Sequence, residues 1–251
     1  MDKDFLMKPT LQEILCAGYE EFERTHPLPG YVRRAALAII NCRTPMMGGY
    51  IVSCPEGDFQ RTFFHSCHHR VCPKCSYMKI EQWLVNKKAL MLNCTHYHVI
   101  FTIPDSLNEL WLLNVKLIND TFIKCVKDSL FELLKDRKYM GATPGVVADF
   151  QSWSQELLPH LHIHCIVTGG GLTEDGRWVT PKKECLLPRK VLMKKFRGKF
   201  RYFLLKLAKG AKLQFPPGVS TQKFINLLNK LGRKPWNVKI LPPYDYADGV
   251  V

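Results

Sequence analysis

Apolar and polar residues alternate with a period of two through residues 159–171. Three histidines, His160, His162 and His164, alternate there with leucine, isoleucine and cysteine. This period is typical of a β-strand that is buried on one face, so the three imidazoles would share the other face. Side chains at i and i+2 of a strand point the same way and lie roughly 6–7 Å apart. Two of these histidines are therefore close enough to hold one metal ion between them.

The pattern elsewhere predicts both helices and strands. Apolar residues at helical spacing predict helices over residues 10–24, 31–41, 76–92 and 191–207, and one long helix that begins at residue 105 or 106. Runs rich in β-branched and aromatic residues predict strands over residues 97–103 and 145–153. We expect an α+β fold, with a helical module at residues 1–93 and an antiparallel sheet with helices packed on it at residues 94–251.

The segment between the second and third predicted helices is loop-rich and full of cysteine. Five of the ten cysteines lie there: Cys42, Cys54, Cys67, Cys72 and Cys75. A Cys-x-x-Cys pair that follows other cysteines is a common way to hold zinc tetrahedrally. We favour the last two together with Cys54, and either Cys42 or Cys67 as the fourth ligand. Core cysteines in an ordinary loop are the alternative, and a redox pair lacks the preceding thioredoxin-like strand.

The strand at residues 145–153 offers a further ligand to the histidines. Alternation puts Asp149, Gln151 and Trp153 on one face. If this strand pairs antiparallel with the histidine strand, an oxygen of Gln151 or Gln155 is a third ligand beside the two imidazoles. Two nitrogens and one oxygen leave positions open for water and phosphate, which suits Mg²⁺ or Mn²⁺. The alternative is that the histidines are satisfied structural residues.

The charge of the chain is concentrated near its C-terminal end. The formal net charge is +14 and the pI is near 9.4, and residues 185–244 hold fifteen Lys and Arg with no Asp or Glu. Such an excess favours a polyanion, so we expect DNA as the partner and no small-molecule substrate. The predicted DNA contacts are Lys194, Lys195, Arg197, Lys199 and Arg201. The aromatic residues Phe200, Tyr202 and Trp236 either stack on unpaired bases or belong to the core.

The N-terminal residues lack the basic start and apolar run of a signal peptide, and no stretch of 18 apolar residues occurs. We therefore expect a cytoplasmic protein with no membrane partner. In a reducing compartment, its cysteines favour metal binding over disulfides.

Two histidines that flank one apolar residue, as in His162-Ile163-His164, form the motif of the HUH superfamily of single-strand nucleases. More closely, the chain resembles rolling-circle insertion-sequence transposases with an N-terminal zinc-binding domain, the ISCR-related group. Further matching blocks are residues 42–45, 48–49, 64–75, 101–104, 159–171 and 196–200.

The resemblance implies an activity and its cofactors. A transposase of this kind cleaves and joins single-stranded DNA, or hairpins, at the ends of its mobile element. A structural Zn²⁺ and a catalytic Mg²⁺ or Mn²⁺, held by His162, His164 and Gln151, would support the reaction. A tyrosine nucleophile would form a 5′-phosphotyrosine intermediate, which stores the energy of the broken bond. The alternatives are an HUH replication initiator or relaxase, and a non-catalytic zinc-dependent DNA-binding protein.

Two departures from the family pattern affect these expectations. Gly57 stands where relatives have the second cysteine of another Cys-x-x-Cys pair, so one zinc ligand must come from elsewhere. The family's catalytic tyrosine lies on a helix just beyond a segment like residues 242–251, so we expect a fragment that ends before that helix. Tyr244 and Tyr246 are the fallback nucleophiles.

Overall fold

The computed structural model describes residues 9–182 and 185–245. The chain divides into two units, Met1–Leu90 and Met91–Val251, whereas the sequence placed the boundary after residue 93.

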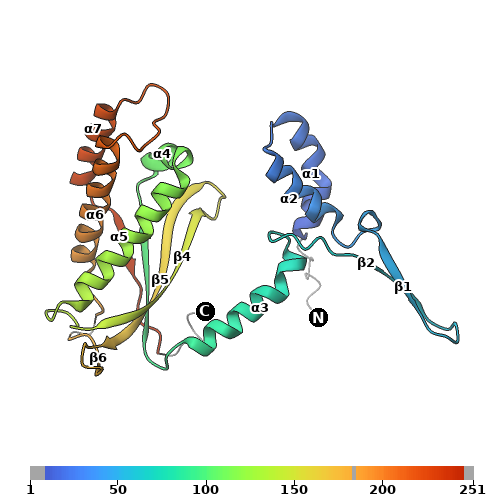
Figure 1. Cartoon of the computed structure of the whole chain (residues 1–251), viewed down its shortest axis with the longest axis horizontal. Helices are drawn as coiled ribbons and strands as arrows, with labels where there is room; N and C mark the ends of the chain where they lie inside the picture. Colours follow the sequence, from blue (N-terminus) through green and yellow to red (C-terminus); the bar gives the residue numbers. More distant parts are fainter. Residues whose placement is uncertain (1–8, 183–184, 246–251) are drawn as a thin grey trace, which may run out of the picture. The chain divides into compact units, whose positions relative to one another are not determined.

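The first unit consists of helices and one β-hairpin. Its elements are α1 (Leu11–Thr25), α2 (Gly30–Asn41), the 3-10 turn η1 (Pro45–Met47), β1 (Gly49–Ser53), β2 (Gln60–Phe64) and α3 (Pro73–Leu90) (Figure 1). Thr10 begins α1 with a reciprocal cap: its hydroxyl accepts from the Glu13 backbone, and the Glu13 carboxylate accepts from the Thr10 backbone. The third helix begins three residues earlier than predicted, so its first turn includes Cys75.

The β-hairpin corrects the expectation of a purely loop-rich segment. Strands β1 and β2 pair antiparallel, with Tyr50 opposite Phe63 and Val52 opposite Arg61. Every residue of both strands is exposed. Because neither face is buried, the hairpin shows no alternation of apolar and polar residues, and period-two reasoning misses it.

The second unit is built on an antiparallel sheet in the order β4-β5-β3-β7, with β6 paired to β5. Its strands are β3 (His96–Thr102), β4 (Thr143–Trp153), β5 (Pro159–Leu172), β6 (Trp178–Val179) and β7 (Asn237–Ile240). Its helical elements are η2 (Asp105–Leu107), α4 (Asn108–Leu113), α5 (Val115–Lys135), α6 (Arg189–Lys209) and α7 (Thr221–Arg233). The expected α+β fold class is confirmed.

The long helix predicted from residue 105 is interrupted at Asn114. The backbone of this residue leaves the helical region, at φ −135° and ψ 37°. Its side-chain amide donates to the carbonyls of Leu110 (2.8 Å) and Gln214 (2.7 Å), and its Oδ1 accepts from the Gln214 backbone (2.9 Å). The break therefore ties the start of α5 to a segment one hundred residues away.

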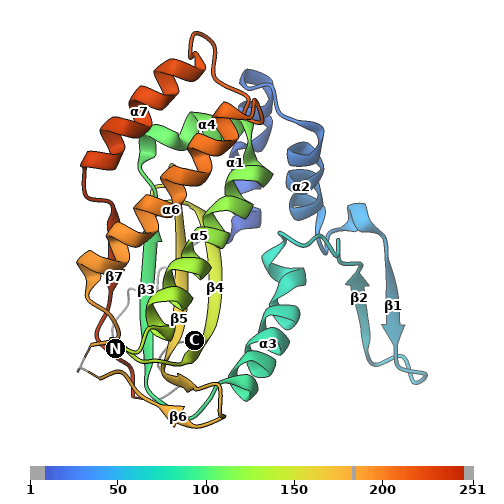
Figure 2. The same ribbon diagram turned by 60° about the vertical axis from the view of Figure 1, so that its left-hand side comes forward.

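Helices α5 and α6 lie across one face of the sheet (Figure 2). Phe196 of α6 packs edge-on against Phe101 of β3, with ring centroids 5.1 Å apart, and also contacts Phe122 of α5. Helical spacing in the sequence predicts an apolar stripe of Leu192, Phe196, Phe203 and Leu207 on this helix, but Phe203 and Leu207 are only partly buried. The residues of α6 that are buried are Leu192, Phe196, Phe200, Leu204 and Ala208. The stripe follows i, i+4 spacing because α6 packs against the sheet, α5 and α7 together.

Among the residues that the structure describes, no helix is long and apolar enough to cross a membrane.

Candidate functional site

The histidine strand β5 presents its imidazoles on the sheet face opposite the helices. Leu161, Ile163 and Cys165 are buried against the core, while His162 and His164 are half-buried on the other side. In β4, Gln151 lies opposite His162 and Asp149 lies opposite His164. The structure therefore brings together Gln151, His162 and His164 as the alternation suggested.

The hydrogen bonds of His162 leave a lone pair facing Gln151. Its Nδ1 lies 2.8 Å from the His160 carbonyl oxygen, which can only accept, so Nδ1 carries the hydrogen. In a neutral ring Nε2 is then unprotonated, and it lies 3.0 Å from Gln151 Oε1. The Gln151 amide nitrogen donates to Asp149 Oδ2 (3.1 Å), which fixes the amide with its oxygen toward the imidazole.

Two lone pairs that face each other at this separation fit a cation between them. Ligands at right angles around an octahedral ion, each about 2.1 Å from it, are roughly 3 Å apart. The donor set of imidazole nitrogen and amide oxygen also suits Mn²⁺ or Mg²⁺ with open positions. The residues present therefore fit a divalent metal.

A fourth group, His98 of β3, was missed by the sequence reasoning. Its Nε2 lies 2.7 Å from His164 Nδ1, so His98 holds the ring of His164 in place. In the tautomer in which His164 Nδ1 donates this bond, His164 Nε2 carries a lone pair. Burial lowers the pKa of His98. Burial, and then the neighbouring His98 and His162, lower the pKa of His164. Both rings are thereby held neutral, which is the form that binds metals. Only the pairing of β3 with β5 would have revealed this contact.

These residues line an open, polar pocket. Its lining residues are Ile100, Thr102, Gln151, Trp153, Ser154, Gln155, Glu156, His160, His162, His164, Asn237 and Lys239. Gln155, the alternative oxygen ligand, lies in the turn after β4 and lines the pocket without pairing to a histidine strand residue. His160 lies 3.2 Å from the exposed Asp105 carboxylate.

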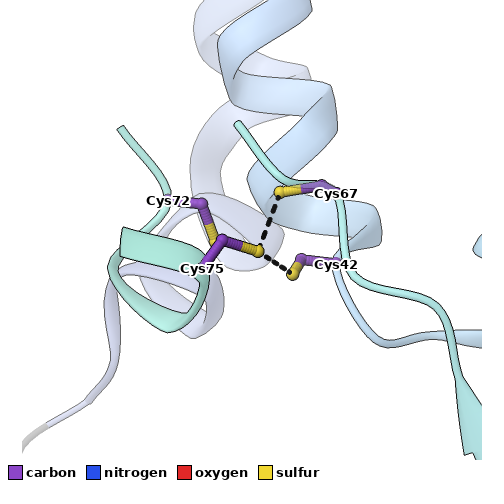
Figure 3. A group of neighbouring side chains, drawn as sticks. All are labelled: Cys42, Cys67, Cys72 and Cys75. Carbon is purple, nitrogen blue, oxygen red and sulfur yellow. Dashed lines mark hydrogen bonds between the residues drawn. The ribbon is translucent and has the colours of Figure 1, made fainter. Parts of the chain in front are cut away.

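The cysteine cluster of the first unit consists of Cys42, Cys67, Cys72 and Cys75, whose sulfur atoms lie within 4.8 Å of one another (Figure 3). Cys42 ends α2, and Cys72 and Cys75 flank the start of α3. The Cys75 sulfur lies 3.5 Å from that of Cys42 and 3.6 Å from that of Cys67. Sulfurs around a tetrahedral zinc, each about 2.3 Å from the ion, are roughly 3.8 Å apart, so the cluster fits zinc.

The preference for Cys54 as a zinc ligand differs from this arrangement. Cys54 follows β1 at the turn of the hairpin, where its neighbours are Glu56 and Asp58. The hairpin carries it away from the other sulfurs, and both Cys42 and Cys67 join the cluster instead.

Burial and mutual hydrogen bonds shift the pKa values of the clustered thiols in both directions. Burial raises the pKa of Cys67 to about 12 and raises that of Cys42. Burial also opposes ionisation of Cys75, but the thiols of Cys42 and Cys67 outweigh it and bring its pKa to about 7. One thiolate is stabilised by its neighbours, whereas four thiolates together require the charge of a metal.

The basic residues predicted to bind DNA lie on α6, on the opposite face of the sheet from the histidines. Four of the five have partners within the fold. Lys195 (2.7 Å) and Lys199 form ion pairs with Glu132 of α5. Arg197 donates to the Lys234 carbonyl, and Arg201 donates to the Leu228 carbonyl and the Asn229 side chain. Lys194 has no ion pair or hydrogen bond of this kind among the described residues. DNA contact by α6 stays a prediction.

The aromatic residues of the basic segment are divided between core and surface. Phe200 is fully buried and Trp236 is 6% exposed, and their rings pack together, so neither is available to stack on bases. Tyr202 is 60% exposed. Tyr246 lies outside the described residues, and Tyr244 forms a backbone bridge to His96.

The chain thus combines a four-cysteine cluster that fits zinc with an α+β sheet whose open face carries histidines in a polar pocket. Residues 14–103 match the family model described as a transposase zinc-binding domain, and residues 145–251 match the model described as a putative transposase. The chain therefore belongs to the insertion-sequence transposases that carry this zinc-binding domain, which confirms the family resemblance.

Two curated relatives agree with this assignment. The chain is 34% identical over 217 residues to a putative transposase, y4qJ, of Sinorhizobium fredii, which covers 84% of the chain and 54% of the relative. It is 32% identical over 126 residues to the transposase for insertion sequence element IS801 of Pseudomonas savastanoi pv. phaseolicola, which covers 50% of the chain and 29% of the relative. The chain thus spans about half or less of the length of these relatives.

Among solved structures, the chain is similar to the conjugative relaxase TrwC in complex with OriT DNA, at 16% identity over 44% of each chain and a TM-score of 0.37. A metal-bound TrwC complex matches at 14% identity over 56% of this chain and 65% of the other, with a TM-score of 0.35. Similarities at these scores carry no argument about fold or function.

Proposed function

We propose that this chain is part of a transposase that cleaves and joins single-stranded DNA at the ends of a mobile element, with Mg²⁺ or Mn²⁺ bound by His162, His164 and Gln151. The observation that carries the proposal is the 3.0 Å separation of His162 Nε2 and Gln151 Oε1, whose lone pairs face each other in a polar pocket. A bound divalent ion would polarise the scissile phosphate there.

The residues around the ligands hold them in position. His98 holds the ring of His164, and Asp149 holds the Gln151 amide with its oxygen toward His162. Such supporting hydrogen bonds typically change metal affinity 10- to 100-fold. Lys239, exposed on the pocket rim, is placed to contact a DNA phosphate.

The nucleophile in this proposal is a tyrosine. Its Oη attacks the phosphorus, forms a phosphotyrosine ester with the 5′ phosphate and releases the 3′ hydroxyl, and rejoining reverses these steps. Tyr246 is the candidate that this chain offers. Zinc, in the four-cysteine cluster, has a structural role.

Metal binding and cleavage are tested together. We expect His162→Ala and His164→Ala to weaken Mn²⁺ binding at least tenfold, measured by titration with electron paramagnetic resonance, and to abolish any Mn²⁺-dependent nicking of labelled single-stranded DNA. His160→Ala is the matched control on the same strand face, and should retain Mn²⁺ affinity within about twofold. A covalent adduct that disappears with Tyr246→Phe would identify the nucleophile.

Unchanged Mn²⁺ affinity in both histidine variants would contradict the proposal and favour a non-catalytic zinc-dependent DNA-binding protein. An HUH replication initiator or relaxase is disfavoured because the family match includes the zinc-binding domain. Cleavage that is restricted to the ends of one mobile element would separate a transposase from either.

A further inference from the structure

The β-hairpin of the first unit carries an aromatic surface that the proposed chemistry does not use. Tyr50 of β1 and Phe63 of β2 are directly opposite each other, and their rings stack with centroids 5.5 Å apart and planes 18° from parallel. The His65 ring lies beside Tyr50, at 6.0 Å. Strand alternation puts Tyr50, Phe63 and Arg61 on the same face.

This surface contributes nothing to a core. Tyr50 is 56% exposed and Phe63 is 36% exposed, and no residue of either strand is buried. Exposed apolar side chains that lie together and are rimmed by polar residues are typical of interaction sites. Their exposure therefore indicates binding and not folding.

The charge around the rings defines the partner. The Arg61 guanidinium lies over the Phe63 ring, 5.0 Å from its centroid. A pocket along this face is lined by Arg43, Tyr50, Arg61, Thr62, Phe63, Phe64, His65 and Ser66. No carboxylate is among these lining residues, and the chain from Gln60 to Ile80 contains four Lys and Arg and no Asp or Glu. An anionic ligand with flat faces fits this combination.

The base of the hairpin is fixed against the zinc module. Arg43 has a left-handed backbone, with φ 58°, and its N–H donates to the His65 carbonyl (3.1 Å). His65 N–H in turn donates to the Gly48 carbonyl (3.0 Å). The rings and the guanidinium of Arg61 are thus held on a strand pair whose position depends on residues next to Cys42 and Cys67.

We infer that this hairpin face, formed by Arg43, Tyr50, Arg61, Phe63 and His65, binds single-stranded DNA. Unpaired bases stack on the Tyr50 and Phe63 rings, and the two arginines contact the flanking phosphates. Stacking needs the π-face of a base, which only an unpaired strand exposes. The inference rests on the proposed function only for the choice of DNA as the anionic ligand. The hairpin surface itself is remote in sequence from the histidines and is argued from its own residues.

The test uses the full 251-residue chain with His162→Ala and His164→Ala, so that the histidine centre makes no metal-dependent contribution. Fluorescence anisotropy with a labelled 20-nucleotide single strand should show at least a tenfold loss of affinity for Tyr50→Ala/Phe63→Ala, since each stacked base is worth roughly five- to a hundredfold in affinity. Ile51→Ala is the matched control, because Ile51 is 59% exposed on the other face of the same hairpin. It should change the affinity less than twofold.

Two further measurements complete the test. Arg61→Ala should lower the slope of log affinity against log salt by about 0.7, as expected for one lost phosphate contact on a single strand. A strand that carries 5-iododeoxyuridine should photo-crosslink to the peptide that contains Tyr50 or Phe63. Zinc content must equal that of the parent protein in every variant, which excludes loss of the module as a cause.

Equal affinities for the double variant and Ile51→Ala would overturn the inference, and so would crosslinks confined to the second unit. Tighter binding of a duplex of the same sequence, lost in the double variant, would overturn the choice of single strands. Because affinity and crosslinking are read without cleavage, a failure of the nuclease proposal would leave this result intact.

Discussion

The two units of the chain are held together by different means. The second unit has a continuous apolar core to which strands β3 and β5 and helices α5, α6 and α7 all contribute. In the first unit, the described residues that are buried are Tyr19, Ala36, Ile39, Cys42 and Cys72. Two of these five are members of the cysteine cluster.

The difference assigns different physical roles to the two metal centres. A unit with so few buried side chains gains little from the hydrophobic effect, so bound zinc is expected to supply much of its folding free energy. The histidine centre lies on the open face of a sheet whose other face already packs a large core. A metal there is expected to serve chemistry, and its removal should leave the fold intact.

The largest expected effect follows from removing zinc. A strong chelator should unfold the first unit and leave the second unit folded, because structural zinc contributes on the order of 10–16 kcal/mol in small modules. Hydrogen exchange measured by mass spectrometry should show loss of protection in α1 and α2, with α5 and α6 unchanged. Protection retained in the first unit would mean that its small apolar core suffices.

A matched pair of cysteine variants sharpens this result. Cys67→Ala removes a cluster member and should reproduce the effect of chelation, whereas Cys54→Ala should keep one zinc per chain. Zinc stoichiometry by elemental analysis distinguishes them. Loss of zinc only in the Cys54 variant would restore the ligand set that the sequence favoured.

In the second unit the central strands and the helix α6 were predicted from sequence, whereas α7, β6 and β7 were not. Strand β5 has one buried face, so alternation located it within about one residue. The run of β-branched and aromatic residues located β4 within about two residues, and alternation put Gln151 on the face that meets the histidines. The interruption at Asn114 was not predictable, because it depends on Gln214, which is distant in sequence. His98 was missed for the same reason: its contact with His164 exists only once β3 and β5 are adjacent.

In the first unit the sequence located the cysteines but not their geometry. Spacing alone did not distinguish Cys54 from Cys67, since the hairpin that removes Cys54 has no buried face and therefore no period-two signal. The charge of α6 predicted a DNA-binding surface. The sequence did not show that Lys195 and Lys199 pair with Glu132, because Glu132 lies on α5 and meets them only when α5 packs on α6.

A substitution that creates a cavity in the core of the second unit should have a smaller effect on stability. Phe196 is fully buried among Phe101, Phe122 and Trp236, and Phe196→Ala should lower the free energy of unfolding of this unit by about 3–5 kcal/mol. Tyr202→Ala, on the exposed side of the same helix, should change it by roughly 0.5 kcal/mol or less. Urea denaturation followed by circular dichroism, with zinc kept saturating, measures both.

The smallest effect concerns the ion pairs on the outer side of that core. Glu132 is partly exposed, and hydrogen bonds from Lys195 and then Lys199 lower its pKa below the ordinary 4.5. A lowered carboxyl pKa adds stability above the ordinary value, and this contribution is lost as the pH falls through the lowered pKa. Solvent screening limits it to about 1 kcal/mol or less. Glu132→Gln should therefore destabilise the unit slightly at pH 7, and this difference should shrink as the pH falls through the lowered pKa, in urea titrations at a series of pH values. The same substitution frees Lys195 and Lys199 from their ion pairs. If α6 contacts DNA, Glu132→Gln should therefore raise the affinity of the protein for a single strand at low salt. An unchanged affinity would mean that these two lysines have only a structural role.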